Sequence, residues 1–357
     1  MPKRFVFIVE DLYGGGAQKV LLNTAEGLRQ RGHHVKVFLL IDRRDFEPPV
    51  GLSIENLNLA TRFVRSVSWS LVDRWVASKI EARIQQENPD VVITCSCDRF
   101  ARFLSGENIF HWIHSSILNN RRGYQRAKRK ALQFYSGRRL ICVSEGIKHE
   151  LLHEIHLKPR DIRVIYNPFD ALSISVQAKG NSHLQLPTKY FVSVGRIEPR
   201  KRLDRMLRAY AQSGAQSDLV IVGTGHEKEI SKLKKLAGQL SIQTRVHWLG
   251  FLKNPYPVIR QAQALLLTSD REGLPTVLIE SLICRTPVIS VDCPTGPSEI
   301  LIGRWKEFLV PMTEEKNLAE AIGKMDQQRP EVQELDYRRF LSEETLPQFE
   351  KLTEATK

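Results

Sequence analysis

The sequence predicts an α/β protein made of two doubly wound, Rossmann-like domains that face each other across a cleft. Its 357 residues correspond to roughly two domains of about 150 residues each. In both halves, short apolar runs typical of buried parallel strands alternate with amphipathic helical stretches. Between the halves, residues 171–188 are rich in Ser, Gly, Asn and Gln and lack strong periodicity, which indicates a linker. We therefore expect a first domain at 1–170 and a second at 189–335.

The first series begins with an apolar run at 5–9, which predicts a strand buried on both faces. Three glycines at 14–16 and an amphipathic helix that stops at Arg31-Gly32 follow, and 35–41 predicts the next strand. Such a strand–helix–strand unit implies a parallel sheet with a ligand crevice at the carboxyl ends of its strands. Further strands are expected at 91–94, 109–113, 140–143 and 163–166.

The second series begins with a strand at 190–194, followed by a basic segment and a helix at 203–211. The same alternation then predicts strands at 218–223, 245–250, 264–269 and 287–291, and helices at 223–238 and 275–284. Because strands again alternate with helices, we expect a second parallel sheet.

Composition excludes several classes of protein. Hydrophobic residues make up 42% and charged residues 26% of the chain, which excludes a disordered, collagen-like or coiled-coil protein. Five cysteines occur without a CxxC pair or a zinc-ligand spacing, so we expect a reducing compartment and no Cys/His zinc site. The first apolar run is too short for a signal peptide core, and no window reaches about 18 apolar residues. We therefore expect a cytoplasmic protein whose contact with a membrane is peripheral.

The glycines Gly14, Gly15 and Gly16 stand between a predicted strand and a predicted helix. Without Cβ atoms the backbone can approach a ligand closely, and a helix N-terminus favours an anion such as a diphosphate. Lys19 stands where a third glycine would complete a GxGxxG motif. A tight strand-to-helix turn is the alternative interpretation.

A pair of cations follows the strand at 190–194. If that strand ends at Gly195, Arg196 and Lys201 can point into the crevice and neutralise a leaving diphosphate. The alternative is a solvated basic turn, because Arg200 is basic too.

The most informative stretch is DREGLPTVLIE, which ends at Glu280. Glu272 lies in the loop after a predicted strand, and Pro275 suits a first helical turn, so the free amides at 274–277 would form an anion site. We expect Glu280 to be partly buried, where a carboxylate needs donors such as sugar hydroxyls. The alternative is one carboxylate at a helix N-terminus and one surface glutamate.

A series of motifs runs through both halves. EGLPTVLIE and PVISVDCPTGPSEIL follow, in order, GGGAQKVLLNTAEGL, ICVSEGIKHEL, VIYNPFD, VSVGRIEPRKRLDRMLRAY, LVIVGTGHE and VHWLGF. This series resembles the family 4 glycosyltransferases of the GT-B fold over about residues 3–303. The resemblance implies a first domain that binds the acceptor and a second that binds the nucleotide sugar. The final YRRFLSEETLPQFEKL resembles the family's terminal helix, so residues 336–357 are expected to cross back to the first domain.

The resemblance also implies roles for the matching residues. Arg196 and Lys201 would hold the diphosphate oxygens, Glu272 would bind the hydroxyls of the donor sugar, and Glu280 would hold the ribose hydroxyls. The backbone of Gly15, Gly16, Gly273, Leu274, Pro275 and Thr276 would approach or cap the phosphates.

One histidine is part of the same resemblance. His114, in WIHSS after a predicted strand, matches the family's histidine near the transferred sugar. His111 is the nearby alternative, and a lone histidine on a strand is more often structural than functional.

A basic segment in the first half is a separate signal. No Asp or Glu occurs from Asn108 to Ser144, and the half before the linker carries +9 of the net charge of +13. Aromatic residues are interleaved with the cations, a pattern typical of a segment at an anionic lipid surface. A solvated helix face is one alternative, and a nucleic-acid surface is a poorer one. The membrane contact is expected to involve Arg121, Arg122, Arg126, Lys128, Arg129 and Lys130.

These observations together predict a glycosyltransferase that moves a hexose or N-acetylhexosamine from a UDP-sugar to a lipid-linked or lipopolysaccharide-type glycan. The resemblance implies retention of the anomeric configuration and no obligatory metal. We expect no cofactor, and action at the inner face of the cytoplasmic membrane. An NAD-dependent oxidoreductase is one rival, because Asp42 lies where that fold has its ribose-binding acid. A noncatalytic basic binding module is the other, but it would leave Glu272 and Glu280 without a purpose.

Overall fold

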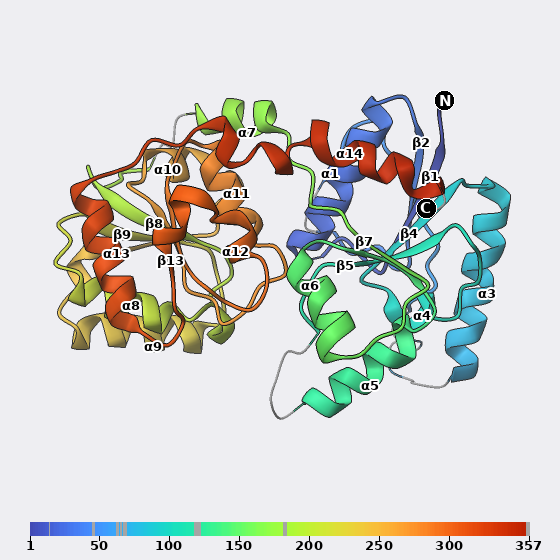
Figure 1. Ribbon diagram of the computed structural model, residues 1–357, viewed down its shortest axis with the longest axis horizontal. Coiled ribbons are helices and arrows are strands. Elements are labelled where there is room, and N and C mark those ends of the chain that lie inside the picture. The colour runs from blue at the N-terminus through green and yellow to red at the C-terminus, as the bar shows by residue number, and fades with distance from the viewer. Residues whose placement is uncertain are drawn as a thin grey trace. The chain divides into compact units, whose positions relative to one another are not determined.

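The computed structural model describes residues 1–13, 15–44, 47–61, 64, 66, 70–117, 123–180 and 184–354. The chain forms two compact units (Figure 1). Unit 1 comprises Met1–Phe169 together with the segment from Ser342 onward, and unit 2 comprises Asp170–Leu341.

Unit 1 is built on a seven-stranded sheet in which the neighbouring strands are parallel and follow the order β3-β2-β1-β4-β5-β6-β7. Its strands are β1 (Arg4–Val9), β2 (His34–Leu39), β3 (Ser53–Asn56), β4 (Val91–Cys95), β5 (Ile109–Ile113), β6 (Arg139–Cys142) and β7 (Asp161–Val164). Its helices include α1 (Gly16–Gln30), α3 (Ser70–Glu87), α4 (Asp98–Ala101), α5 (Tyr124–Tyr135), α6 (Glu145–His149) and α14 (Ser342–Glu350). The predicted apolar strands are confirmed. The short edge strand β3 was not expected, because its sequence SIEN has no apolar run.

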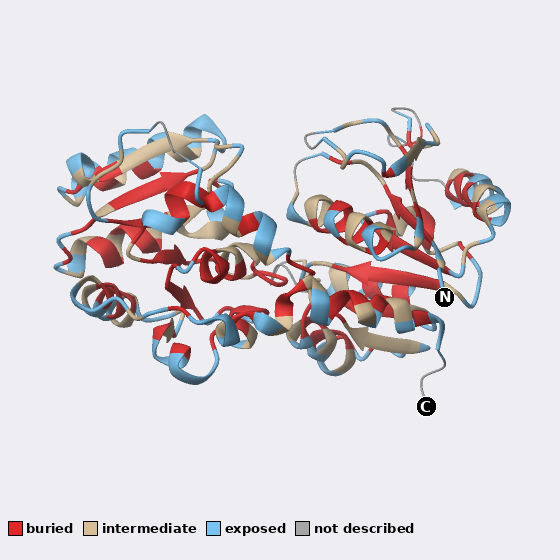
Figure 2. Cartoon of the chain, turned by 90° about the horizontal axis from the view of Figure 1, so that it is seen from above, coloured by how far each residue is buried: buried red, intermediate tan, exposed pale blue. Residues whose placement is uncertain are grey.

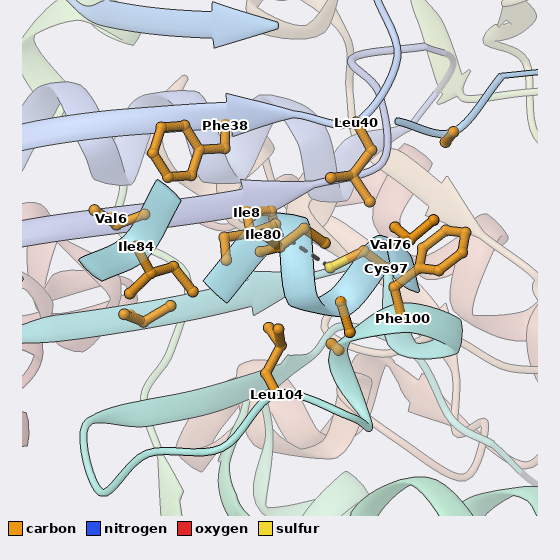
Figure 3. Packing of buried hydrophobic residues seen from close by; sticks show 14 of the residues in the cluster. Val6, Ile8, Phe38, Leu40, Val76, Ile80, Ile84, Cys97, Phe100 and Leu104 are labelled. Carbon is orange, nitrogen blue, oxygen red and sulfur yellow. Dashed lines mark hydrogen bonds between the residues drawn. The ribbon is translucent and has the colours of Figure 1, made fainter. Parts of the chain in front are cut away.

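The core of unit 1 lies between the sheet and α3. Val76, Ile80 and Ile84 recur at helical spacing, so they share one face of α3. This face packs with Ile8 of β1 and Phe38 of β2 in one buried cluster (Figure 3). The strands of both units are largely buried, while exposed residues concentrate on the outer faces of the helices (Figure 2).

Unit 2 is built on a six-stranded parallel sheet in the order β10-β9-β8-β11-β12-β13. Its strands are β8 (Tyr190–Val194), β9 (Asp218–Val222), β10 (Val246–Gly250), β11 (Leu265–Leu267), β12 (Val288–Val291) and β13 (Leu309–Val310). Its helices include α7 (Ala171–Ala178), α8 (Leu203–Gln212), α9 (Glu227–Gln239), α10 (Tyr256–Gln261), α11 (Thr276–Ile283), α12 (Pro297–Ile300) and α13 (Glu315–Gln327). The strand order reverses between β8 and β11, and an open parallel sheet binds its ligands at the carboxyl ends of such strands.

The expected linker at 171–188 is wrong in its first part. Residues Ala171–Ala178 form α7, which is capped by the Asp170 carboxylate accepting a hydrogen bond of 2.8 Å from the Ser173 amide. Ile174 and Ala178 are buried, and α7 contacts α10 and α11. The polar composition of the segment hid a helix of two turns whose apolar side packs on unit 2.

The last helix returns to unit 1. α14 contacts α1 so closely that a Cβ at Gly27 would lie 2.7 Å from a methyl carbon of Leu346. At its last residue, the Glu350 carboxylate accepts a hydrogen bond from Arg31 Nε at 2.6 Å and pairs with His33 Nε2 at 2.9 Å. The Lys3 ammonium donates to the Glu350 backbone carbonyl. The end of α14 is therefore bonded to residues before β1 and after α1.

This contact predicts a pH-dependent contribution to stability. The hydrogen bonds from Arg31 outweigh the effect of burial, and with His33 they lower the pKa of Glu350 to about 2 from an ordinary value of 4.5. Since the folded pKa is depressed, the stabilisation is fully present above pH 4.5 and is lost as the pH falls toward 2. Glu350→Gln is expected to lower the free energy of unfolding at pH 7 by at most about 3 kcal/mol, and the difference from wild type should shrink below pH 4.5. Urea unfolding at pH 7, 5 and 3.5 measures it, and a difference that does not change with pH contradicts the prediction.

Candidate functional site

The predicted donor residues of unit 2 gather at the carboxyl ends of β8 and β11. Gly195 follows β8 directly and leads to the short 3₁₀ turn η2 (Pro199–Lys201). Glu272 follows β11 and leads into α11. Both sequence segments therefore meet where the strand order reverses.

A glycine follows β8 and another follows β9, and the two loops approach each other closely. Gly195 has φ +153° and Gly223, after β9, has φ +140°. A Cβ on Gly223 would lie 1.8 Å from the Gly195 carbonyl oxygen. The two loops can run side by side because Gly223 carries no side chain, whereas at Gly195 it is the positive φ that favours glycine.

Lys201 and Glu272 form the centre of the site. The Lys201 ammonium donates a hydrogen bond of 2.7 Å to Glu272 Oε1, and the glutamate is only 9% exposed. Arg196, expected beside Lys201, instead has a side chain that is 65% exposed and lies 3.9 Å from Glu198. The structure thus places Lys201 in a partly buried ion pair and leaves Arg196 directed to solvent.

Sequence reasoning did not place Arg200 in the site and named it only in support of the alternative, a solvated basic turn. Its guanidinium lies 3.9 Å from Glu272 Oε2 and donates to Glu198 at 2.7 Å and to the Arg271 carbonyl at 3.3 Å. The Thr268 hydroxyl at the end of β11 donates to the Lys201 carbonyl at 3.0 Å. These bonds hold the basic turn against the acidic loop. No signal in the run EPRKR distinguishes Arg200 from its basic neighbours, because its contact with Glu272 joins positions 72 residues apart.

The N-terminus of α11 lies four residues after Glu272, beside the Lys201–Glu272 pair. Pro275 is the residue before the helix, no side-chain hydrogen bond caps it, and Gly273 and Leu274 are buried. Pro275 has no N–H, so the expected row of amides at Gly273–Thr276 is wrong at this position. Gly296, with φ +94°, packs from the loop after β12, where a Cβ would lie 2.5 Å from Pro275. The helix end is therefore shaped by close backbone packing and carries the partial positive charge of a helix N-terminus.

Glu280 lies on the second turn of α11. Its Oε1 accepts a hydrogen bond of 3.1 Å from the hydroxyl of Tyr256, a buried residue at the start of α10. Burial and the nearby Glu280 carboxylate raise the pKa of Tyr256, so this phenol remains a hydrogen-bond donor. Tyr256 orients the carboxylate and was not found from the sequence, because its partner is 24 residues away.

In unit 1, Gly15 and Gly16 form the start of α1. Gly15 is the extended residue before the helix, and a Cβ on Gly16 would meet no atom of the described residues within 4 Å. Gly14 lies outside the described residues. Because the fold leaves open space beside Gly16, local packing gives no reason for glycine there, which favours a ligand role over a tight turn.

The two candidate histidines differ sharply. His111 lies within β5, is 2% exposed, and its Nδ1 is 3.0 Å from the Thr94 hydroxyl; burial and Arg138 lower its pKa to about 4. His114 follows the end of β5, and its ring lies against that of Trp112, with centroids 4.3 Å apart and the ring planes tilted by 51°. Its Nε2 is buried and has no hydrogen-bond partner among the described residues, and burial lowers its pKa to about 3. His111 is therefore a satisfied core residue, and His114 is a neutral imidazole at the carboxyl edge of the sheet.

The basic segment forms α5. Arg126, Arg129 and Lys130 are exposed and, at helical spacing, share one face of the helix. Lys128 is half-buried and donates a hydrogen bond of 3.0 Å to the Glu154 carbonyl. Arg121 and Arg122 lie outside the described residues.

Further observations concern the rivals. Asp42, the candidate ribose-binding acid of an oxidoreductase, accepts a hydrogen bond of 2.5 Å from Arg44 Nε. In the part of the chain that the structure describes, no group of three or more His, Cys, Asp and Glu is placed to hold a metal ion. None of the described helices combines the length and the apolar character that a membrane span requires.

Comparison with known proteins agrees with this geometry. Residues 14–171 match the profile of Glycosyltransferase Family 4, and residues 177–339 match Glycosyl transferases group 1. Lipopolysaccharide 1,6-galactosyltransferase of Escherichia coli K12 is 27% identical over 317 residues, which cover 84% of this chain and 82% of that protein. A Campylobacter jejuni N-acetylgalactosaminyltransferase acting on a diphospho-undecaprenol substrate is 30% identical over 182 residues, or 51% of this chain and 49% of that one.

Solved structures show the same fold. The apo form of the lipopolysaccharide outer core galactosyltransferase WaaB is 21% identical with a TM-score of 0.73, covering 98% of both chains. Anabaena HepE in complex with UDP and glucose is 18% identical with a TM-score of 0.73, again covering 98% of both. The chain therefore belongs to the family 4 glycosyltransferases of the GT-B fold, and it is a glycosyltransferase.

Proposed function

We propose that this glycosyltransferase moves a hexose or N-acetylhexosamine from a UDP-sugar to a lipid-linked or lipopolysaccharide-type glycan, with retention of the anomeric configuration. The observation that carries the proposal is the Lys201–Glu272 pair beside the N-terminus of α11. The relatives named above act on lipopolysaccharide and on a diphospho-undecaprenol glycan, which supports this class of acceptor.

The pair explains how a donor diphosphate would be bound. Lys201, Arg200 and the helix N-terminus place positive charge at one point, where a diphosphate leaving group develops negative charge. A diphosphate competes with Glu272 for Lys201, and the carboxylate that it releases can accept hydrogen bonds from sugar hydroxyls. Arg196, exposed and 3.9 Å from Glu198, is free to turn toward the second phosphate. Positioning and charge stabilisation then supply the catalysis, with no metal and no cofactor.

The nucleoside would be held by Glu280. Two vicinal ribose hydroxyls match the two oxygens of one carboxylate, and Tyr256 fixes how that carboxylate is turned. In unit 1, the open backbone at Gly16 and the neutral His114 would approach the diphosphate and the transferred sugar.

Donor hydrolysis tests the proposal. The protein is incubated with mass-tagged UDP- and GDP-sugars, with and without EDTA, and release of nucleoside diphosphate is followed. We expect release from one UDP-hexose or UDP-N-acetylhexosamine that EDTA does not change, and NMR should first detect the axial anomer of the released sugar when the donor is axial. Turnover of a GDP-sugar alone, or full inhibition by EDTA, would contradict the assignment of donor or of metal independence.

The exposed face of α5 predicts binding to the inner face of the cytoplasmic membrane. Each cation near an anionic surface contributes about 1 kcal/mol, so replacing Arg126, Arg129 and Lys130 with serine should weaken binding to phosphatidylglycerol vesicles about 100-fold. Binding should also fade with salt, because the Debye length falls from about 10 Å at 0.1 M to about 3 Å at 1 M.

Vesicle sedimentation measures this binding. The matched control replaces three exposed lysines of α9, Lys228, Lys232 and Lys235, which removes the same charge from unit 2. Equal losses in both triple variants would show that net charge, and not this helix face, drives the association.

A further inference from the structure

A buried carboxylate ties down the loop that carries His114. Glu150 is 4% exposed, and its Oε1 accepts a hydrogen bond of 2.6 Å from the Ile117 amide. Its other oxygen, Oε2, accepts one from the Ser116 hydroxyl. Both donors belong to the segment after β5, only two and three residues beyond His114.

The position of Glu150 makes this contact informative. It is the first residue of η1 (Glu150–Glu154), a π-helical turn that continues α6, closed by a bond of 2.9 Å from the Ile155 amide to the Glu150 carbonyl. π-Helical turns are rare and occur frequently at functional sites. Since α6 follows β6, which pairs with β5, the carboxylate joins two neighbouring strand–helix connections at the carboxyl edge of the sheet.

The consequence concerns His114. Its ring packs against the tilted ring of Trp112 in β5, and the chain two residues later is fixed by Glu150. A buried carboxylate is unfavourable unless it is hydrogen-bonded. Moving the loop would leave the Glu150 carboxylate without these two donors, so the two hydrogen bonds fix the loop in place. The imidazole is therefore confined from both sides, with Nε2 unpartnered among the described residues.

We propose that Glu150 is a positioning residue for sugar transfer: by fixing Ser116 and Ile117, it keeps His114 Nε2 where it meets the transferred sugar. The inference rests on the proposed function for what His114 contacts, but the confinement of the ring can be tested without any substrate.

The sequence around Glu150 also has the pattern of a zinc-binding motif, but the geometry contradicts this interpretation. His149-Glu150-Leu-Leu-His153 has the spacing of the HExxH zinc motif, whose glutamate acts beside a metal held by the two histidines. Here His149 and His153 are exposed, whereas the Glu150 carboxylate is buried and bonded to the loop after β5. The Glu150 carboxylate is therefore engaged in hydrogen bonds to the loop after β5 and is not placed to act at a zinc site.

Two substitutions test the proposal. Glu150→Ala is expected to lower kcat of sugar transfer about tenfold and to leave KM for the donor nearly unchanged. Glu150→Gln should restore most of the activity, because its amide oxygen accepts from Ile117 and its amide nitrogen donates to the Ser116 hydroxyl, which can also accept. In NMR titrations, His114 should stay neutral down to about pH 3 in wild type and titrate closer to about 6.5 in Glu150→Ala, where water reaches the ring.

Asp73→Asn is the matched control. Asp73 is an equally buried carboxylate of unit 1, 2% exposed and held by Arg99 and Arg102, but it is not bonded to the His114 loop. If Glu150→Ala loses no more activity than Asp73→Asn below both unfolding temperatures, or leaves the His114 titration unchanged, the proposal is overturned. Ser116→Ala replaces Glu150→Ala if the latter does not fold, and it should shift both readouts in the same direction. A wild type without transferase activity would refute the proposed function, while the titration would still decide whether Glu150 confines the ring.

Discussion

Replacing Lys201 with alanine is expected to lower kcat/KM for sugar transfer at least about tenfold, which corresponds to about 1.4 kcal/mol of transition-state stabilisation. The ammonium is the closest positive charge to Glu272, at 2.7 Å, and without it Arg200 remains at 3.9 Å. Charge on the departing diphosphate is then less well balanced. Because Glu272 is 9% exposed, the variant should also lose about 1–3 kcal/mol of folding free energy.

Steady-state kinetics with the donor identified by hydrolysis measure the effect, at a temperature where circular dichroism shows both proteins folded. Lys201→Arg retains the charge with a different shape and should recover part of the activity. Lys316→Ala is the control, since Lys316 is an exposed lysine of α13 whose side chain is 84% exposed. Near wild-type turnover in Lys201→Ala would remove Lys201 from the diphosphate site.

Substitutions of Glu280 and Glu272 should affect the binding of UDP and of the UDP-sugar differently. Glu280→Ala is expected to weaken binding of free UDP and of the UDP-sugar alike, by roughly 10- to 100-fold, because a hydrogen-bonded charged group is worth about 1.5–3 kcal/mol. Glu272→Gln should weaken the UDP-sugar by a similar factor and leave UDP nearly unchanged, because UDP lacks the sugar that Glu272 contacts.

Isothermal titration calorimetry with both ligands distinguishes these outcomes. Tyr256→Phe removes the phenol that donates to Glu280 at 3.1 Å and should reproduce a smaller part of the Glu280→Ala loss for both ligands. Equal losses of UDP and UDP-sugar in all three variants would show that the two carboxylates do not divide the donor between them.

Much of the fold could be predicted because the parallel strands are buried on both faces. Continuous apolar runs such as FVFIV and DLVIV predict buried strands without any information about tertiary contacts, and both lie in strands of the structure. β3 could not be predicted, since its half-exposed sequence SIEN has neither an apolar run nor a clear alternation. α7 was mistaken for a linker because a helix of eight residues that buries only two of them leaves little periodicity.

The site was predictable in its residue types but not in its pairings. Lys201 and Glu272 were both expected, yet their direct contact joins positions 71 residues apart and follows from strand order. For the same reason Arg200 could not be told from Arg196 by sequence: both are basic and near Gly195, and only the loop after β11 decides which one faces Glu272. His114 and His111 differ by three residues, and the end of β5 separates the satisfied ring from the unpartnered one.

The return of the chain to unit 1 at Ser342 has a consequence for synthesis. Unit 2 is one uninterrupted segment, Asp170–Leu341, whereas unit 1 is divided between the two ends of the chain. As the protein leaves the ribosome, the sheet of unit 1 emerges first, but Arg31 and His33 must wait for Glu350, more than three hundred residues later. Unit 2 can therefore fold completely before α14 has been synthesised, whereas unit 1 can complete its packing only after α14 has joined it.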